Sequence, residues 1–342
     1  MKSLFCVLIL VCVAAPLAAA QDQQVRLDVV DFFGSSGIDV AQLRAVMPVH
    51  VGSTFKSDDR KMVREQIRQA VAKVTGHDPT DMALVCCTDQ GGSMYYIGLQ
   101  GKSYRQFAYN AAPAGTDKLP QEGLDAYQKA ADALLHAVES GQAREDDSKG
   151  YALTSDPTEH AAQLGMRDYA VQHEDVIRLA LANSSDVTSR QAASELLGYA
   201  NQSQGQIDAL VAASRDPDEF VRNNAVRALA VLASSSSAVA AKIPPDNFIA
   251  MLNSGTWTDR NKGGFLLDGL TVPRDPKVLH ELDAGARESL IEMARWHEAG
   301  HASEYRILLG RIAGIEEQKL QTMAEDNAQV ETIISALPAQ QK

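Results

Sequence analysis

An internal repetition that begins near residue 174 constrains the fold of this chain more than any other feature. Each copy has an apolar helical stretch, a short polar turn and a second helical stretch. Two-helix units of this length bury their apolar faces only by stacking on their neighbours. The sequence therefore predicts a mainly α fold, an α-solenoid of helical hairpins. The predicted helix pairs are 175–182 with 190–198, 207–214 with 221–229, 248–252 with 260–267, and 290–295 with 302–310.

Equivalent positions of the copies carry equivalent residue types. An arginine near the start of the second helix recurs after 32 residues (222 − 190) and again after 38 (260 − 222). A small residue three positions later lets neighbouring helices approach, and a leucine one turn further on fills the seam between them. These anchors are Arg190, Arg222 and Arg260, then Ala193, Ala225 and Gly263, then Leu197, Leu229, Leu267 and Leu309.

The second copy is the most specific one. Its stretch Asp216–Leu229, DPDEFVRNNAVRAL, closely resembles the HEAT-like repeats also found in phycobilisome-lyase-type proteins. The resemblance covers residues 160–315 and implies that Asp218 caps the second helix while Arg222 bridges to a neighbouring repeat. The lyase activity does not carry over, because it belongs to a cytoplasmic pigment system and this chain is predicted to be exported.

The resemblance weakens along the chain. The cap and bridge roles carry over more loosely to Asp186 and Arg190 in the first copy. The third copy has Trp257-Thr258-Asp259 in place of Asp-Pro-Asp, and the fourth has Ala302 in place of the arginine. The third and fourth copies are therefore assigned less firmly to the repeat.

Export is predicted by the first twenty residues. Lys2 precedes an apolar run over 4–13, Pro16 breaks it, and a small-residue stretch ends at Ala20. This order is typical of a signal peptide cleaved after Ala20, which leaves Gln21 first. An uncleaved anchor is the alternative, although the run is shorter than the ~20 residues that span a bilayer. No later stretch is apolar enough to cross a membrane, so a periplasmic or extracellular protein is expected.

A small α+β domain is expected over residues 21–110. Alternation over 25–33 predicts a strand, and helical spacing predicts helices over 38–47 and after Ser57-Asp58-Asp59, which is expected to cap the second helix. Two strands, 82–88 and 94–100, flank the turn sequence DQGG. The order β-α-α-β-β, with Phe33-Gly34 and Val51-Gly52-x-x-Phe55, resembles a POTRA domain. The resemblance implies a module that engages other chains, often by adding a strand at a sheet edge.

Two clusters in this domain leave alternatives open. The aromatic residues Tyr95, Tyr96, Tyr104, Phe107 and Tyr109 are expected to pack in the core and at its edge, with a carbohydrate or peptide platform as the alternative. The adjacent Cys86 and Cys87 are the cysteines left after signal cleavage. One buried thiol and one on the opposite face are expected, because successive strand residues point to opposite faces. A vicinal disulfide or an intermolecular link is the alternative.

A helix and a linker are predicted to join the two halves. Residues 121–139 have one apolar face and predict a helix. Residues 140–148 lack apolar side chains and carry several charges, so they are expected to be exposed. The predicted organisation is a signal peptide at 1–20, the α+β domain at 21–110, this helix and linker at 111–157, the solenoid at 158–337 and a tail at 338–342.

One motif argues for an enzyme. The segment 297–301, His-Glu-Ala-Gly-His, matches H-E-x-x-H, in which helical histidines hold zinc and the glutamate polarises a bound water. With Ala302 it resembles the motif of ATP-dependent membrane zinc proteases, although their phosphate-binding loop is absent from the sequence. That resemblance implies His297 and His301 as zinc ligands and Glu298 as the catalytic residue. Asp326 is the candidate third ligand, and Glu316 and Glu317 are the alternatives.

The repeat alignment places the same motif in a turn. The offset between Leu197 and Leu309 (309 − 197 = 112) carries His297 to Ser185 and His301 to Ser189, on either side of a predicted helix start. A turn does not present residues i and i+4 on one face. We therefore expect no metal or other cofactor and no catalytic residue, with a zinc metallohydrolase as the alternative.

Charge narrows the range of partners. The formal net charge is −12, and no basic stripe interrupts it, which argues against nucleic acid as a partner. The leading hypothesis is an exported, non-enzymatic scaffold that binds other proteins through a solenoid surface, and the sequence does not identify those proteins.

Overall fold

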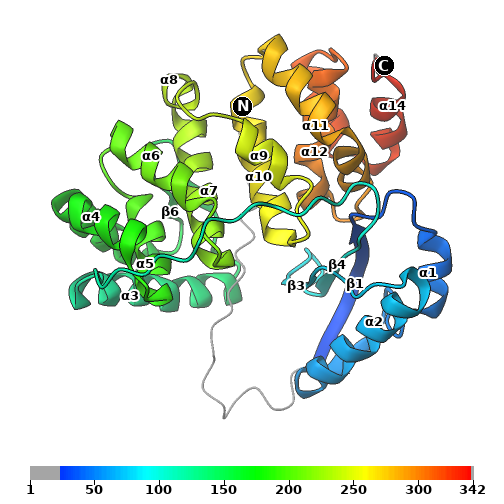
Figure 1. Cartoon of the computed structure of the whole chain (residues 1–342), viewed down its shortest axis with the longest axis horizontal. Helices are drawn as coiled ribbons and strands as arrows, with labels where there is room; N and C mark the ends of the chain where they lie inside the picture. The colour runs from blue at the N-terminus through cyan, green and yellow to red at the C-terminus, as the bar shows by residue number, and fades with distance from the viewer. Residues whose placement is uncertain (1–23, 340–342) are drawn as a thin grey trace. The chain divides into compact units, whose positions relative to one another are not determined.

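The computed structural model describes residues 24–339, so the predicted signal peptide lies outside the described residues. The protein is mainly helical, with a small sheet near its N-terminus (Figure 1). Two compact units share the chain. The helical unit comprises Ala108–Phe248 and Lys262–Pro273. The mixed unit comprises the described residues up to Phe107, Ile249–Asn261, and the chain from Arg274 onward.

The sheet of the mixed unit contains the three predicted strands and one more. Strands β1 and β4 are parallel neighbours, and both edge strands are antiparallel to their partners, in the order β2-β1-β4-β3. The extra strand β2 covers three residues, which is too short to show alternation in the sequence. The strands are β1 (Gln24–Phe33), β2 (Thr54–Lys56), β3 (Met82–Cys86) and β4 (Ser93–Gly98).

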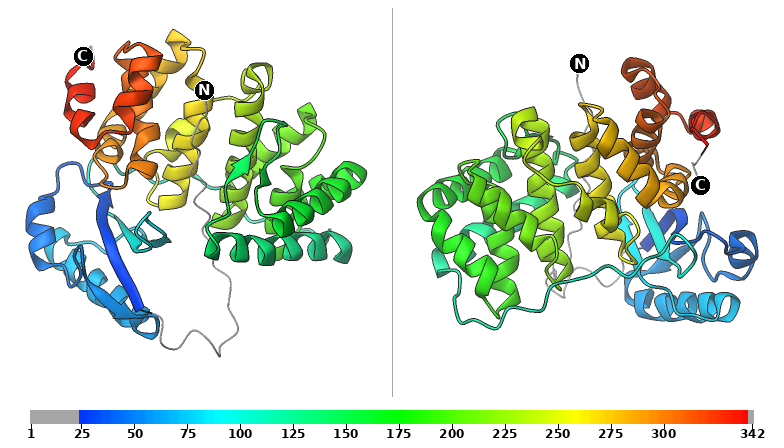
Figure 2. Two further views of the ribbon diagram at one scale, coloured as in Figure 1. Left: turned by 180° about the vertical axis from the view of Figure 1, so that it is seen from behind. Right: turned by 45° about the horizontal axis from the view of Figure 1, so that its top comes forward.

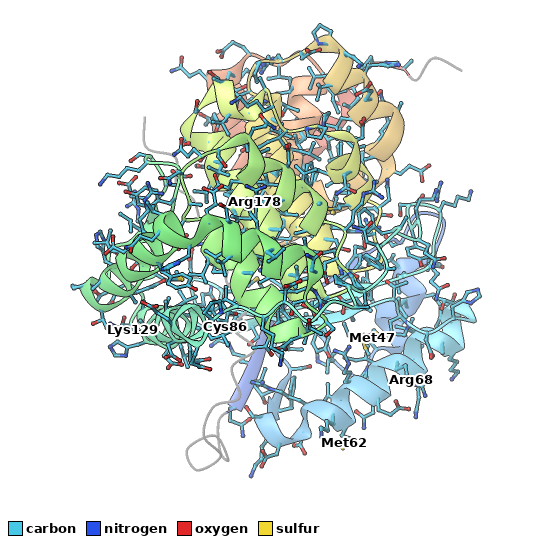
Figure 3. All side chains as sticks on the ribbon, turned by 60° about the vertical axis from the view of Figure 1, so that its left-hand side comes forward. Met47, Met62, Arg68, Cys86, Lys129 and Arg178 are labelled. Carbon is cyan, nitrogen blue, oxygen red and sulfur yellow. A yellow bond between two sulfur atoms is a disulfide. The ribbon has the colours of Figure 1, made fainter. Side chains whose placement is uncertain are left out.

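Two helices cover one face of this sheet. Helices α1 (Val40–Val46) and α2 (Arg60–Thr75) pack on it through a core that includes Leu27, Leu43 and Ile67, all fully buried. Gly76 ends α2 in the left-handed conformation (φ 76°). The expected cap is not found, because Ser57–Asp59 form a short 3-10 turn and Asp59 makes no side-chain cap bond. The opposite side of α2 is exposed, as at Met62 (Figure 3).

The mixed unit also contains the last helices of the chain. The indole Nε1 of Trp296 donates to the backbone oxygen of Phe32 at 2.9 Å, which ties the turn between α11 and α12 to strand β1. These helices are α11 (Pro276–Ala294), α12 (Ala299–Ile312), α13 (Glu317–Ala324) and α14 (Val330–Ser335), with the 3-10 turn η2 (Asn327–Gln329).

Successive antiparallel helices build the helical unit (Figures 1 and 2). Helix α3 (Gln121–Glu139) has the predicted bounds. The predicted helices of the first two copies overlap α4 to α7, although α4 begins eighteen residues earlier than predicted (175 − 157), and the leucine anchors Leu197 and Leu229 are fully buried. The remaining bounds are α4 (Pro157–Asn183), α5 (Val187–Leu197), α6 (Gln204–Ala213), α7 (Glu219–Ser235), α8 (Ser237–Ala240), α9 (Asp246–Met251) and α10 (Trp257–Thr271).

The segment predicted as an exposed linker is partly structured. Strand β5 (Glu145–Asp146) pairs with β6 (Leu153–Thr154) as a small antiparallel ladder. The side chain of Glu145 is only 3% exposed, because it pairs with an arginine in the interior of the unit. The prediction that residues 140–148 are exposed is therefore wrong for the side chain of Glu145. Within residues 24–339, no helix combines the length and apolarity that crossing a membrane requires.

Candidate functional site

The H-E-x-x-H segment spans a helix boundary. His297 precedes α12, Glu298 is the N-cap position, and His301 lies in the first turn of the helix. This is the boundary that the repeat alignment predicts. His301 is 2% exposed as a residue, whereas 68% of the His297 side chain is exposed. The two imidazoles therefore lie in different environments.

Each of these imidazoles makes its own hydrogen bond. Nδ1 of His301 lies 2.6 Å from the hydroxyl of Tyr96, a buried residue of strand β4. Tyr96 also packs on Trp257 and Trp296, with ring centroids 5.3 and 4.7 Å away. Burial raises the pKa of Tyr96 well above its ordinary value. His301 is therefore part of an aromatic cluster that holds the helices on the sheet.

His297 bonds Asp31 of strand β1, the residue paired with Tyr96 in the neighbouring strand β4. Its Nδ1 lies 2.7 Å from Oδ1 of the buried Asp31, and its backbone nitrogen donates to Oδ2 at 2.7 Å. Arg44 also bonds Asp31, at 3.2 Å. The hydrogen bond that the Asp31 carboxylate accepts raises the pKa of His297. This pair fixes the turn before α12 on strand β1.

The candidate third ligands have other partners. Glu316 caps α13 by accepting from two backbone nitrogens, and Asp326 caps the 3-10 turn η2 by accepting from one, that of Ala328. Glu317 accepts from Arg311 at 2.8 Å, and this bond lowers its pKa to about 2. Among residues 24–339, no group of three or more His, Cys, Asp or Glu side chains could hold a metal ion.

The arginine anchors give the turns of three hairpins the same hydrogen bond. Arg190, Arg222 and Arg260 are all buried, and each donates to the backbone oxygen six residues before it, at 2.9, 2.9 and 2.6 Å. Each guanidinium thereby closes the turn between the two helices of its own hairpin. Arg190 also donates to both carboxylate oxygens of Asp216 in the next hairpin, at 2.8 and 3.1 Å. Arg190 therefore bridges to the next hairpin, a role that the resemblance implies for Arg222 and more loosely for Arg190.

The aspartate anchors cap helices as expected. Asp218 accepts from the backbone nitrogens of Phe220 and Val221, and Asp186 accepts from Thr188. In the third copy the start of α10 receives its cap from elsewhere, since Trp257 donates its backbone nitrogen to Asp81 at 2.9 Å. A carboxylate from the sheet region therefore replaces the missing Asp-Pro-Asp.

The fourth copy also keeps a buried arginine, but one helical turn later than the alignment places it. Arg306 donates to the backbone oxygens of Ala294 and Trp296 in the preceding turn, at 2.9 and 3.2 Å. Ala302, at the aligned position, is fully buried. The arginine was missed because the sequence alignment was anchored on the leucine and glycine at the end of the helix.

An extended segment, residues 108–118, lies along the turns of the helical unit. We call this segment the strap. Figure 1 shows it passing the ends of α7 and α5 before the chain enters α3. Asn110 donates its backbone nitrogen to Arg215 O at 2.7 Å, and Ser185 donates to Gly115 O at 2.9 Å. The ring of Tyr109 lies 4.2 Å from the guanidinium carbon of Arg222. Sequence reasoning placed this segment at a domain boundary and missed these contacts.

The interior of the helical unit holds a second unpredicted cluster. Arg227 donates to both oxygens of Glu145 at 2.6 Å and to Glu195 at 3.2 Å. Glu159, 2% exposed, accepts from Gln163 at 3.1 Å. Burial, then repulsion from Glu145, raises the pKa of Glu159 to about 8. A pKa raised this far favours the protonated form of Glu159 in the folded protein at neutral pH.

The aromatic residues and the two cysteines of the N-terminal region were the other candidates. Tyr95, Tyr96 and Phe107 are buried, Tyr104 is partly exposed and Tyr109 is 41% exposed, which agrees with the expected packing in the core and at its edge. Cys86 and Cys87 are both exposed and joined by a disulfide, so the expected buried thiol is not found. No family model and no curated protein matches this chain.

Proposed function

We propose that this is an exported, non-enzymatic scaffold whose helical hairpins, of the HEAT-like type, bind other proteins. The repeat assignment is supported by the turn-closing bond of three arginines and by the capping aspartates of the first two copies. We assign the hairpins to a short solenoid and the N-terminal sheet with its two helices to a POTRA-like module. Residues 1–20 serve as the signal peptide in this proposal, so the mature protein is periplasmic or extracellular.

The strap is the observation that carries the proposal. In the helical unit, a stretch of polypeptide lies extended across two consecutive hairpins and bonds to their turns through its own backbone. Backbone recognition of this kind depends little on the sequence of the bound segment. The strap, an extended segment of the chain itself, binds to these turns, which supports a hairpin surface suited to extended polypeptide.

Helix α4 offers a second surface of the same unit. One side of α4 packs against α3, α5 and α6. Leu164 and Val171 before the kink at His173, and Val176 and Leu179 after it, are between 39% and 49% exposed. Exposed apolar surface of this kind supports protein binding. Arg178, labelled in Figure 3, belongs to the same helix.

The contacts of the H-E-x-x-H residues support structural roles. Nδ1 of His297 is hydrogen-bonded to Asp31, and Nδ1 of His301 to Tyr96. Asp31 and Tyr96 both belong to the sheet of the mixed unit. Glu298 occupies the N-cap position of that helix. We therefore assign His297, Glu298 and His301 to the fold and take zinc hydrolysis as the alternative that a metal measurement must test.

The test is photo-crosslinking in the cells that produce the protein. A photoreactive phenylalanine analogue is placed at Leu179 or Ser185, both exposed, and at the exposed Lys129 of α3 as the control. The proposal predicts discrete adducts with the same partner from Leu179 or Ser185, and none from Lys129. The adduct at Ser185 should weaken when Leu179 is replaced by glutamate. Equal adducts at all three positions, or none at any, would contradict the proposal.

A further inference from the structure

The strap contacts the same turn position in successive hairpins. Within the helical unit, Asn110 donates to Arg215 O, and Gly115 lies against Asn183 O, one repeat earlier (215 − 183 = 32). The spacing equals that between Arg190 and Arg222. The mixed unit repeats the contact, since Arg105 donates its backbone nitrogen to Asn253 O at 2.8 Å, and Asn253 is the next equivalent position (253 − 215 = 38).

The segment has a register of five residues. Within the helical unit the contacting positions 110 and 115 are five apart, so the strap meets one copy of the repeat every five residues. The hairpin contributes a backbone oxygen at each step, whatever its side chain. A site built from such repeated backbone groups fixes the register of a bound peptide but not its sequence.

Three positions of the strap favour particular residue types within the helical unit. The flat guanidinium of Arg222 stacks on the ring of Tyr109, which favours an aromatic residue there. A Cβ at position 115 would lie 2.5 Å from Asn183 O, so only glycine fits. Lys118 Nζ lies 3.8 Å from a carboxylate oxygen of Asp186, which favours a basic residue three positions later.

The strap is held loosely enough to be displaced. Of residues 108–118, none is fully buried, and Tyr109 is 41% exposed. No large apolar side chain anchors the segment between the helices. Its advantage over an outside peptide is covalent connection, which corresponds to an effective concentration of roughly millimolar for short linkers.

We propose that the turns of the helical unit, Asn183–Asp186 and Ala212–Arg215 with Arg222, form a docking site for an extended segment of a partner protein. We call it the strap site. The partner segment carries an aromatic residue, a glycine six positions later and a basic residue three positions after that. The strap occupies this site in cis and must leave for the partner to bind. This inference rests on the proposed scaffold function and adds the chemistry of the partner.

The test uses the full chain with its strap released. The variant Tyr109→Ala/Asn110→Pro/Gly115→Val removes the stacked ring, the backbone donor and the fit against Asn183. The probe is a fluorescent peptide with the sequence of residues 104–119, followed by anisotropy. We expect binding at least about a hundredfold tighter than to the unaltered chain, in which the strap competes. Thr116→Val, an exposed strap position, is the control and should bind as weakly as the unaltered chain.

Peptide variants test the selectivity without altering the protein. Peptides with alanine at the tyrosine of position 109, or valine at the glycine of position 115, should bind the released chain at least about tenfold more weakly, because each loses one of the three selective contacts. The milder variant Tyr109→Ala should show intermediate affinity and covers the case in which the triple variant does not fold.

Each of the following results decides the inference. Equal affinity for all peptides, or no binding by either folded released variant, would overturn it. Dimerisation of the released chain that excludes the peptide would assign the site to a second copy and would also overturn it. If peptide binding fails while crosslinks at Leu179 persist, this inference falls and the scaffold proposal stands. If both fail, the scaffold proposal falls as well.

Discussion

Asp216→Ala tests the seam between the first two hairpins. The carboxylate of Asp216 accepts from Arg190 at 2.8 and 3.1 Å, and the two side chains are 6% and 4% exposed. Removing one partner of a buried pair leaves a charge without compensation, which costs about 3–5 kcal/mol. Asp218→Ala, the control, removes a helix cap and one neutral bond across the same seam, from Gln191, and should cost about 0.5–2 kcal/mol.

Native-state hydrogen exchange of the α5 and α7 amides measures this cost within the helical unit. The expected loss in opening free energy is larger for Asp216→Ala than for Asp218→Ala by about 2 kcal/mol or more. Replacing both partners, as Arg190→Met with Asp216→Leu, should restore most of the stability, because no buried charge remains unpaired. Equal costs for the two single variants, or a double variant as unstable as Asp216→Ala, would refute the reasoning.

Three further predictions concern the core, pH and export. Leu229→Ala should cost about 2–5 kcal/mol in urea unfolding, because this fully buried anchor leaves a cavity, whereas Val272→Ala, 62% exposed, should change stability by less than about 0.5 kcal/mol. Because burial raises the pKa of Glu159 from 4.5 to about 8, the folded state binds the extra proton, so stability should fall as pH rises through this range, and Glu159→Gln should flatten the profile. The exported protein should begin at Gln21 by N-terminal sequencing, and an intact Met1 would refute cleavage.

The pH prediction depends on the whole interior cluster. Glu159 faces Glu145 from the β5–β6 ladder and Asp156 from the start of α4, both of which disfavour its ionisation, whereas Arg227 favours it. Glu195 completes the cluster, and burial raises its pKa too. A melting profile of Glu159→Gln that still falls between pH 4.5 and 8 would assign the dependence to these neighbours.

The elements that repeat or alternate could be predicted from the sequence. The helices of the first two copies were visible because apolar spacing and the Arg, Ala and Leu anchors recur together. Strand β2 and the β5–β6 ladder were not, because three and two residues are too few for a period to show. Their formation depends on partners far along the chain, such as Arg227 for Glu145.

Long-range contacts account for the other differences. The sequence placed His297 and His301 on either side of a helix start, which a local alignment can do. It did not identify Asp31 and Tyr96 as their partners, since these residues lie more than two hundred positions away on the sheet. The strap was also missed, because its contacts are mainly backbone bonds, which leave no mark on residue type.

Zinc content is the measurement that tests most directly whether this chain is a scaffold or a metallohydrolase. Protein purified without a histidine tag or chelator is compared with His301→Gln by elemental analysis. If His301 serves the aromatic cluster around Tyr96, zinc should be far below one atom per chain in both proteins. One zinc per chain in the unaltered protein, lost in His301→Gln while the helices stay folded, would contradict the scaffold account.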